Sequence, residues 1–549
     1  MERTSKSWGL AMAGGLLCLS LSASAGEKAT LPALESAMIE VDTSGLPASE
    51  QAALVPLLRA SRKLDELYRQ QVWPGTQALI GQREKSQTPG ARAELNALNC
   101  FKGPWGPTGK PFIDRVPSER PIGDFYAPGS TKLEIDGWLG TLSQADRKRA
   151  LDPFTAIERT ANGSFRDVPY SRHYRKTLNE AAASLRDAAA LTHEPTLKNF
   201  LTLRAKALLD DDYYASDVAF VGLKGPIDVA LAPYEVEDDA WFGVKTAYTA
   251  SIALVNEPAT QRFARISTHL QELEDHLPLE ANLRGRKLGA AAPILVLDVI
   301  YHGGLAGAMV EAGYGLPNDL RVLDSVGART GTYRNIMKLS DEEHRAMAAT
   351  VLTDADRSAL RFEDMHDEPT FVRIFDSLGP QFVTGTKQPI AEALGDSAGV
   401  AAQIRSMLLS LWGHRYLVEQ GYLERREAES IYSSFLIVAL TRARAGLDGS
   451  PSKGTTYILN HLLEAKAVSP TSDGRLAIDR AKADVTIAQT TTEFISLMAQ
   501  GNASAIKSLL QRYVLITPAI RDLLPRLGPE PPLLCLDYRT ADRLSPPSL

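Results

Sequence analysis

The stretch Phe371-Val-Arg-Ile-Phe-Asp-Ser-Leu-Gly-Pro380 decides the fold of this chain and limits its chemistry. Its apolar residues suit the packed face of a helix, so residues 366–378 are predicted to be at least partly helical. A catalytic zinc on such a helix needs neutral imidazoles at positions i and i+4, a third ligand and an open position for water. Val372 and Asp376 stand at that spacing, and valine has no lone pair to donate.

The tail of the stretch, Leu378-Gly379-Pro380, is similar to the end of the active-site helix in the dipeptidyl peptidase III family of zinc peptidases, in its shorter bacterial and plant-like branch. There H-E-x-x-H is followed by a small residue and then [LI]-G-P. The resemblance puts Val372 and Asp376 at the two histidine positions and Arg373 at the position of the glutamate that takes a proton from water. Because guanidinium stays protonated in proteins, Arg373 cannot be that base.

The family's third zinc ligand is the second glutamate of an E-E-x-x-A-[DE] helix. Ala391-Glu-Ala-Leu394 and Gly421-Tyr-Leu423 resemble the two ends of that region without a gap between them. In this register Gln403 stands at the ligand position and Ala402 at the preceding glutamate. An amide oxygen is a poor zinc ligand beside thiolate, imidazole or carboxylate.

Two further catalytic positions are also replaced. Residues 227–245 resemble the family's I-D-x-x-I-G-P-x-E-x-Y-E-D-x-L-F-G-Y-K segment, with Glu235 kept and Glu237 in place of the tyrosine that polarises the scissile carbonyl. An ionised glutamate accepts hydrogen bonds and cannot stabilise an oxyanion. In Ser450-Pro-Ser-Lys-Gly454 the resemblance puts Pro451 where the family has a histidine that assists the transition state.

The resemblance spans nearly the whole chain after its first residues, with matching segments in the expected order. Examples are residues 64–73, Gly103-Pro-Trp105, Asp124-Phe-Tyr126 and Leu316-Pro-Asn-Asp319. It implies an α+β, predominantly helical fold of two lobes with an inter-lobe cleft. The expected parts are a mixed α/β lobe over residues 26–250, a helical lobe that would bear the zinc over 251–525, and a strand in 526–549 that returns to the first lobe.

The first 25 residues have the pattern of a signal peptide. Arg3 and Lys6 precede an apolar segment over residues 8–21, and Ala23-Ser24-Ala25 is a small-residue cleavage signal. We expect cleavage after Ala25 and a periplasmic or secreted protein with no membrane span after signal removal. An uncleaved N-terminal anchor is the alternative, although the apolar segment is short for a membrane span.

Composition excludes some partners. The formal net charge is −6 and the pI is about 5.9, which describes a mildly acidic globular protein and gives no basic stripe for nucleic acid. The chain beyond the leader holds more residues than one hydrophobic core usually serves. It keeps two cysteines, Cys100 and Cys535. The family resemblance implies that the segments around both cysteines belong to the same lobe. A disulfide between them and two free thiols are both compatible with the sequence.

Local patterns give further expectations. Residues 26–53 are expected to form a partly ordered arm, and residues 75–152, rich in Gly and Pro, to be coil with short strands. Helices are expected over 57–72, 177–209 with a break near 193–195, 398–420 and 424–445, and strands over 218–221, 227–231 and 531–538.

These observations predict a catalytically inactive dipeptidyl peptidase III-like protein without a metal or other cofactor. Its expected ligands are short peptides, with a periplasmic protein as another partner, and its expected peptide site consists of Glu235, Asp238, Lys245 and Asn318. One alternative is a hydrolase with a rearranged metal site, for example from Asp376, Asp396 and His366. Another is a purely structural or partner-binding protein.

Overall fold

The computed structural model describes residues 31–546 apart from residues 108, 289–293 and 309. The expected signal peptide and its cleavage site after Ala25 lie outside these residues. Within the described part, no helix combines the length and the apolar character that a membrane span requires.

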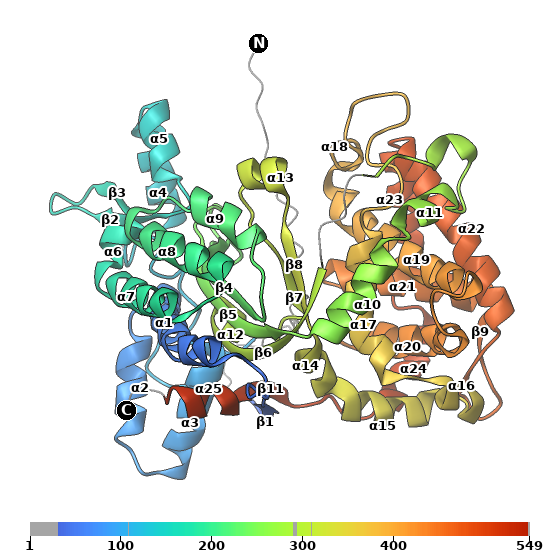
Figure 1. Cartoon of the computed structure of the whole chain (residues 1–549), viewed down its shortest axis with the longest axis horizontal. Coiled ribbons are helices and arrows are strands. Elements are labelled where there is room, and N and C mark those ends of the chain that lie inside the picture. The colour runs from blue at the N-terminus through green and yellow to red at the C-terminus, as the bar shows by residue number, and fades with distance from the viewer. Residues whose placement is uncertain (1–30, 108, 289–293, 309, 547–549) are drawn as a thin grey trace.

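The fold is α+β and predominantly helical, with two lobes side by side (Figure 1). One lobe combines a sheet with helices, and we call it the mixed lobe. The other, the helical lobe, consists almost entirely of helices. Each lobe has its own large hydrophobic core.

The mixed lobe is built around a five-stranded sheet with the order β4-β5-β6-β8-β7. Neighbouring strands are antiparallel except for β6 and β8, which run parallel. The strands are β4 (Ile227–Glu235), β5 (Ala247–Val255), β6 (Ile294–Gly304), β7 (Gly313–Leu316) and β8 (Arg329–Tyr333). The sheet therefore uses segments on both sides of the boundary expected at residue 250.

The helices of the mixed lobe cover this sheet, and two small sheets, β1–β11 and β2–β3, complete the lobe. Helices α1 and α7 pack against each other, and the side chain of Gln71 in α1 bonds to the backbone of Thr246 and Tyr248 at β5. The remaining elements are β1 (Leu34–Ile39), α1 (Ala48–Val72), α2 (Thr76–Glu84), α3 (Pro89–Phe101), α4 (Lys132–Thr141), α5 (Gln144–Ala150), β2 (Thr155–Arg159), β3 (Phe165–Pro169), α6 (Tyr170–His173), α7 (Arg175–Leu191), α8 (Pro195–Asp210), α9 (Tyr214–Val221), α12 (Leu305–Ala308), α13 (Leu320–Val326), β11 (Leu533–Tyr538) and α25 (Arg539–Leu544).

The helical lobe is centred on α17, α19, α20, α21 and α22. Helices α10 and α11 precede β6 in the chain and also pack here, where the ring of Phe263 meets Phe371 edge to face at 5.1 Å. The elements are α10 (Glu257–Ser267), α11 (Leu270–Asp275), α14 (Arg334–Met337), α15 (Asp341–Val351), α16 (Asp354–Ala359), α17 (Phe362–Phe375), α18 (Ile390–Leu394), α19 (Ala398–Glu419), α20 (Arg425–Arg444), α21 (Ser450–Glu464), β9 (Val468–Pro470), β10 (Leu476–Ile478), α22 (Arg480–Ala499), α23 (Ala503–Tyr513) and α24 (Pro518–Leu523), with 3-10 turns at Ala281–Leu283, Lys338–Ser340, Gly395–Ser397 and Leu524–Leu527.

The chain passes between the lobes several times. It enters the helical lobe at α10, returns to the mixed lobe for β6 to β8, and enters the helical lobe again at α14. Strand β11 then pairs in parallel with β1 at the mixed lobe, with Cys535 opposite Ser36. Both lobes are therefore made from separated segments of sequence.

Several predicted elements are confirmed. Residues 57–72 lie in α1, residues 177–209 form α7 and α8 on either side of 193–195, and α19, α20, β4 and β11 fall on their predicted segments. The stretch expected to be at least partly helical, 366–378, lies mostly in α17, which ends at Phe375.

Three local predictions are wrong. Residues 75–152 contain α2 to α5, because Thr88, Thr131 and Ser143 cap helices there and the glycines and prolines mostly lie between them. Residues 218–221 end α9 and form no strand, since a short apolar run does not by itself separate a buried helix from a strand. The described part of the expected arm, residues 31–53, contains β1 and the start of α1, and residues 26–30 lie outside the described part of the chain.

Candidate functional site

The positions that the sequence resemblance assigns to zinc ligands lie where α17, α19 and α21 meet. At Gly454 in α21, a Cβ atom would stand 3.0 Å from Met407 Sδ and 3.3 Å from Gln403 Cγ, both in α19. Val372 in α17 and Met407 line the same small cavity. The structure therefore gathers Val372, Gln403 and the first turns of α21 into one region.

Val372 belongs to the hydrophobic core of the helical lobe. Only 5% of its surface is exposed, and the cavity that it lines has a volume of about 40 Å³, with room for about one water molecule. The neighbouring walls include Phe371, Met407 and Phe435. The side chain of Val372 is therefore held in an apolar environment.

The carboxylate of Asp376 forms hydrogen bonds with two residues of α19. Its Oδ1 atom accepts hydrogen bonds from Arg405 Nη2 at 2.8 Å and from Ser406 Oγ at 2.5 Å. Arg405 also donates to the backbone oxygen of Asp376 and is only 6% exposed. The carboxylate is thus neutralised by a buried guanidinium, which joins the end of α17 to α19.

These residues do not fit a catalytic zinc. Val372 offers no donor atom, Gln403 offers an amide, and Asp376 already balances Arg405. In the described part of the chain, no group of three or more His, Cys, Asp or Glu side chains is placed to hold a metal ion.

The alternative metal site from Asp376, Asp396 and His366 is not assembled either. His366 Nε2 lies 2.6 Å from Asp341 Oδ1, and Asp396 is exposed in a 3-10 turn. His366 and Asp376 are nearly three turns apart along α17, about 15 Å.

Two other positions that the sequence resemblance singles out have local structural roles. Pro451 lies in the first turn of α21, where its missing N–H and fixed φ suit a helix start. The backbone oxygen of Ala402 accepts a hydrogen bond from Ser406, the residue that also contacts Asp376.

Glu235 ends strand β4 next to a β-bulge and belongs to a group of three carboxyl groups. Burial raises its pKa to about 8, with further contributions from the charges of Glu237 and Glu311 and from a hydrogen bond with Glu237. Burial, together with the charge of Glu237, raises the pKa of Glu311 to about 7. Near neutral pH the carboxyl groups of Glu235 and Glu311 are therefore partly protonated.

Arg373 projects from α17 toward the mixed lobe. Its Nη1 atom lies 3.7 Å from where a Cβ of Gly315 in β7 would stand, and Figure 1 shows α17 on the side of the helical lobe that faces β7 and β8. Burial lowers the pKa of the half-buried guanidinium, while the charges of Tyr333, Asp376 and Glu311 act in the opposite direction. Among the described residues it has no hydrogen bond and no ion pair within 4.0 Å.

Asp238 and Asn318 lie near Glu235 but differ in their hydrogen bonds and exposure. Asp238 accepts hydrogen bonds from Tyr68 Oη at 2.7 Å and Arg120 Nη2 at 2.8 Å, so it fastens α1 to this loop. Asn318 Nδ2 donates to the backbone oxygen of Tyr234, directly beside Glu235, and the side chain stays exposed. Asn318 is therefore open to a ligand, and Asp238 is held by the protein.

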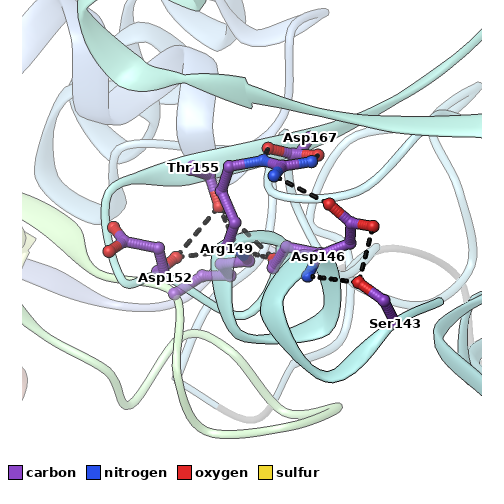
Figure 2. A network of polar contacts seen from close by, with 8 residues as sticks. Ser143, Asp146, Arg149, Asp152, Thr155 and Asp167 are labelled. Atoms are coloured by element: carbon purple, nitrogen blue, oxygen red, sulfur yellow. Dashed lines mark hydrogen bonds and ion pairs between the residues drawn. The ribbon is translucent and has the colours of Figure 1, made fainter.

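Lys245 does not line a ligand site, contrary to expectation. It is fully buried, and its Nζ donates to the backbone oxygens of Ala150 and Asp152 and to Thr155 Oγ1. Burial lowers the pKa of this ammonium to about 8. Figure 2 shows two of its partners, Asp152 and Thr155, within a wider polar network that includes Arg149. Lys245 is thus a structural residue of the mixed lobe.

Cys100 and Cys535 are both free thiols here. Cys100 is buried in α3, and its Sγ lies 3.8 Å from the backbone oxygen of Leu534. The neighbouring thiol of Cys535 in β11, together with burial, raises the pKa of Cys100.

Glu311 and Arg405 were not among the predicted site residues. Glu311 is the only charged residue between His302 and Asn318, in a glycine-rich apolar stretch, which is the signal that could have marked it. Arg405 carried no signal, because its importance arises from contact with Asp376 across two helices.

The chain is similar to known proteins along almost its full length. The chain is 34% identical to the dipeptidyl peptidase III structure from Corallococcus sp. strain EGB, covering 93% of this chain and 96% of that one with a TM-score of 0.76. It is 26% identical to the DPP III structure from Caldithrix abyssi, covering 93% and 99% with a TM-score of 0.88. It is also 25% identical over 547 residues to Nudix hydrolase 3 of Arabidopsis thaliana, covering 89% of this chain and 70% of that protein. No family model matches the sequence.

Proposed function

Because this chain belongs to the dipeptidyl peptidase III family, we propose that it is a member that has lost peptide hydrolysis and retains a binding site for short peptides. The observation that carries the proposal is the region around α17 and α19. Val372 packs into the core there, and Asp376 is neutralised by Arg405, so the ligand set of a zinc peptidase is replaced by apolar packing and an ion pair.

The remaining catalytic roles have no replacement at these positions. Arg373 cannot accept a proton from water, and Glu237 cannot polarise a carbonyl as a tyrosine does. Catalytic groups that act as a unit lose most of their effect when one member is removed. Residual hydrolysis is therefore expected to be at background.

The retained part of the site is Glu235, with Asn318 beside it. A half-buried carboxyl group with a raised pKa gains from a cation that restores its ionised form, and the α-ammonium group of a peptide is such a cation. We place the protein in the periplasm or outside the cell, through a signal peptide cleaved after Ala25; its sequence pattern supports this part of the proposal.

Metal analysis combined with a peptidase assay tests the loss of activity. Protein purified without added metal should contain far less than one equivalent of zinc and should not cleave dipeptidyl arylamides. One equivalent of tightly held zinc, or a chelator-sensitive cleavage that Asp376→Ala abolishes, would overturn the proposal. Amino-terminal sequencing of the exported protein should give Gly26 as the first residue.

Calorimetric titration with short peptides tests retained binding against a purely structural role. Binding that is lost in Glu235→Gln supports the peptide site. The absence of binding to any peptide would leave the structural role.

A further inference from the structure

The mixed lobe carries an open polar pocket of about 870 Å³, lined by residues of α5, α6, α7 and α8 and of strands β2 and β3. Figure 1 shows these elements on the side of the mixed lobe that is remote from the helical lobe. Small-molecule sites usually have volumes of about 300–1,000 Å³, so a ligand fits here. The pocket shares no lining residue with the region of α17 or with the group around Glu235, and it is therefore independent of the proposed peptide site.

The floor of the pocket is fixed from inside the lobe. The buried ammonium group of Lys245 holds the backbone oxygen of Asp152 and the hydroxyl of Thr155. The backbone N–H of Phe154 donates to Asp152 Oδ1 at 2.9 Å. In Figure 2 the carboxylate of Asp152 points away from Arg149. No described residue donates to the second oxygen, Oδ2, so this atom is available to accept a hydrogen bond from a ligand.

Two arginines of the pocket have no partner in the described part of the chain. Arg172 at the end of α6 and Arg175 at the start of α7 are exposed, and their side chains form no hydrogen bond or ion pair with described residues. Arg149 differs, because Asp146 and Asp167 pair with it at 2.9 and 2.8 Å. The two unpaired guanidinium groups are therefore available for a carboxylate, which guanidinium binds through two parallel N–H bonds.

Carboxylates and an amide line the same pocket, but the protein already uses most of them. Both oxygens of Asp211 accept a backbone N–H, at 3.0 and 3.1 Å, and Asp210 pairs with Lys206. Asn179 Nδ2 donates to the backbone oxygen of Arg175 at 2.8 Å, which leaves its Oδ1 as an acceptor. The charge left for a ligand is therefore mainly positive, with single hydrogen-bond acceptors beside it.

We propose that this pocket binds an acidic sugar, with the sugar carboxylate on Arg172 and Arg175 and its hydroxyl groups on Asp152 and Asn179. A hydroxyl group both donates and accepts, so it suits a site that combines such acceptors with guanidinium donors. The half-buried ring of Phe154, packed against a tyrosine ring at 4.8 Å, also lines the pocket and offers an apolar face to the C–H side of a sugar ring.

Matched ligands test this assignment by calorimetric titration. Glucuronate has the carboxylate and the hydroxyl groups, glucose lacks the carboxylate, and glutarate lacks the hydroxyl groups. Glucuronate should bind about tenfold more tightly than either control, because each control loses one set of hydrogen bonds. Glutamate is the fourth ligand, since its ammonium group offers the aspartates a cation in place of hydroxyl groups.

Variants then assign each preference to a residue. Arg172→Gln and Arg175→Gln should each weaken the binding of glucuronate severalfold and leave glucose unchanged, because only glucuronate has a carboxylate. Asp152→Asn should weaken glucuronate and glucose alike and leave glutarate unchanged. Arg425→Gln, at a side chain that is 92% exposed on α20, changes the net charge as much as each arginine variant and should leave every affinity unchanged.

Four results would overturn the inference. Equal binding of glucuronate and glutarate would make the pocket a site for anions in general, and tighter binding of glutamate would make it a site for amino acids. A preference for glucuronate over glucose that survives both arginine variants, with unchanged thermal stability, would place the carboxylate elsewhere. The fourth result is the absence of glucuronate binding. None of these results bears on the proposed peptide binding, because the two sites have no residue in common.

Discussion

Replacing Asp376 by asparagine should destabilise the helical lobe by about 2–3 kcal/mol. The substitution keeps the shape of the side chain and removes the charge that Arg405 and Ser406 contact at 2.8 and 2.5 Å. Breaking a buried ion pair costs about 3–5 kcal/mol, because the remaining charge is left without a partner. Arg405 has 7% of its side chain exposed and Asp376 has 28%, so solvent screening reduces the expected loss below that range, to about 2–3 kcal/mol.

Thermal and urea unfolding measure this effect. For a unit of 150–250 residues, each kcal/mol shifts Tm by about 2–4 °C, so the unfolding transition of the helical lobe should fall by about 5–10 °C. Asp396→Asn is the matched control, since its carboxylate is exposed in the same lobe and its loss should change stability by less than about 0.5 kcal/mol. The double variant with Arg405→Met should lose less than the two single variants together.

The reasoning fails if Asp376→Asn is as stable as Asp396→Asn. It also fails if a chelator lowers the Tm of the unmodified protein and has no effect on Asp376→Asn, because that pattern would mean that Asp376 holds a metal ion rather than Arg405.

Three further predictions concern titration, burial and the thiols. Affinity for alanylalanine should rise from pH 6 towards pH 8, because the ammonium group of the peptide needs ionised Glu235, whose pKa is raised to about 8. Over the same range the free energy of unfolding should fall, since folded Glu235 holds a proton that the unfolded chain releases near pH 4.5. Calorimetry and urea titrations should show that both pH dependences are smaller in Glu235→Gln. Lys245→Met should destabilise the mixed lobe by about 1–3 kcal/mol, because the hydroxyl of Thr155 and two carbonyl groups lose their donor, while the affinity of the folded protein for dipeptides stays the same. Incubation with glutathione disulfide should join Cys100 to Cys535 by thiol–disulfide exchange and raise Tm, and two thiols still titratable in denaturant after this treatment would contradict the prediction.

The sequence was sufficient for the fold class and for most long helices, because these depend on periodic apolar residues and on a resemblance that spans the chain. Segments 398–420 and 424–445 were placed within about a residue of α19 and α20. The short helices α2 to α5 were missed, since glycine and proline dominate the composition there and single capping residues such as Thr88 and Ser143 decide where each helix begins.

The candidate site was predictable only where chemistry depends on residue type. Valine cannot ligate a metal in any fold, so Val372 could be interpreted from sequence. Lys245 could not, because its charge suggested a ligand contact and only the three-dimensional structure shows three oxygen acceptors inside the lobe. The partners of Asp376 and the isolation of Arg373 are likewise tertiary facts, set by the approach of α19 and β7.

Two of the replacements are linked by charge, and this favours a retained ligand site over simple decay. By the family resemblance, Glu237 adds a negative charge where a tyrosine stood, and Arg373 changes a negative position to a positive one. Both act on the same group, Glu311, with opposite effects on its pKa. Loss of catalysis alone would require only neutral residues at both positions. The presence of a carboxylate and a guanidinium that both act on Glu311 instead supports a retained site for a charged ligand beside that residue.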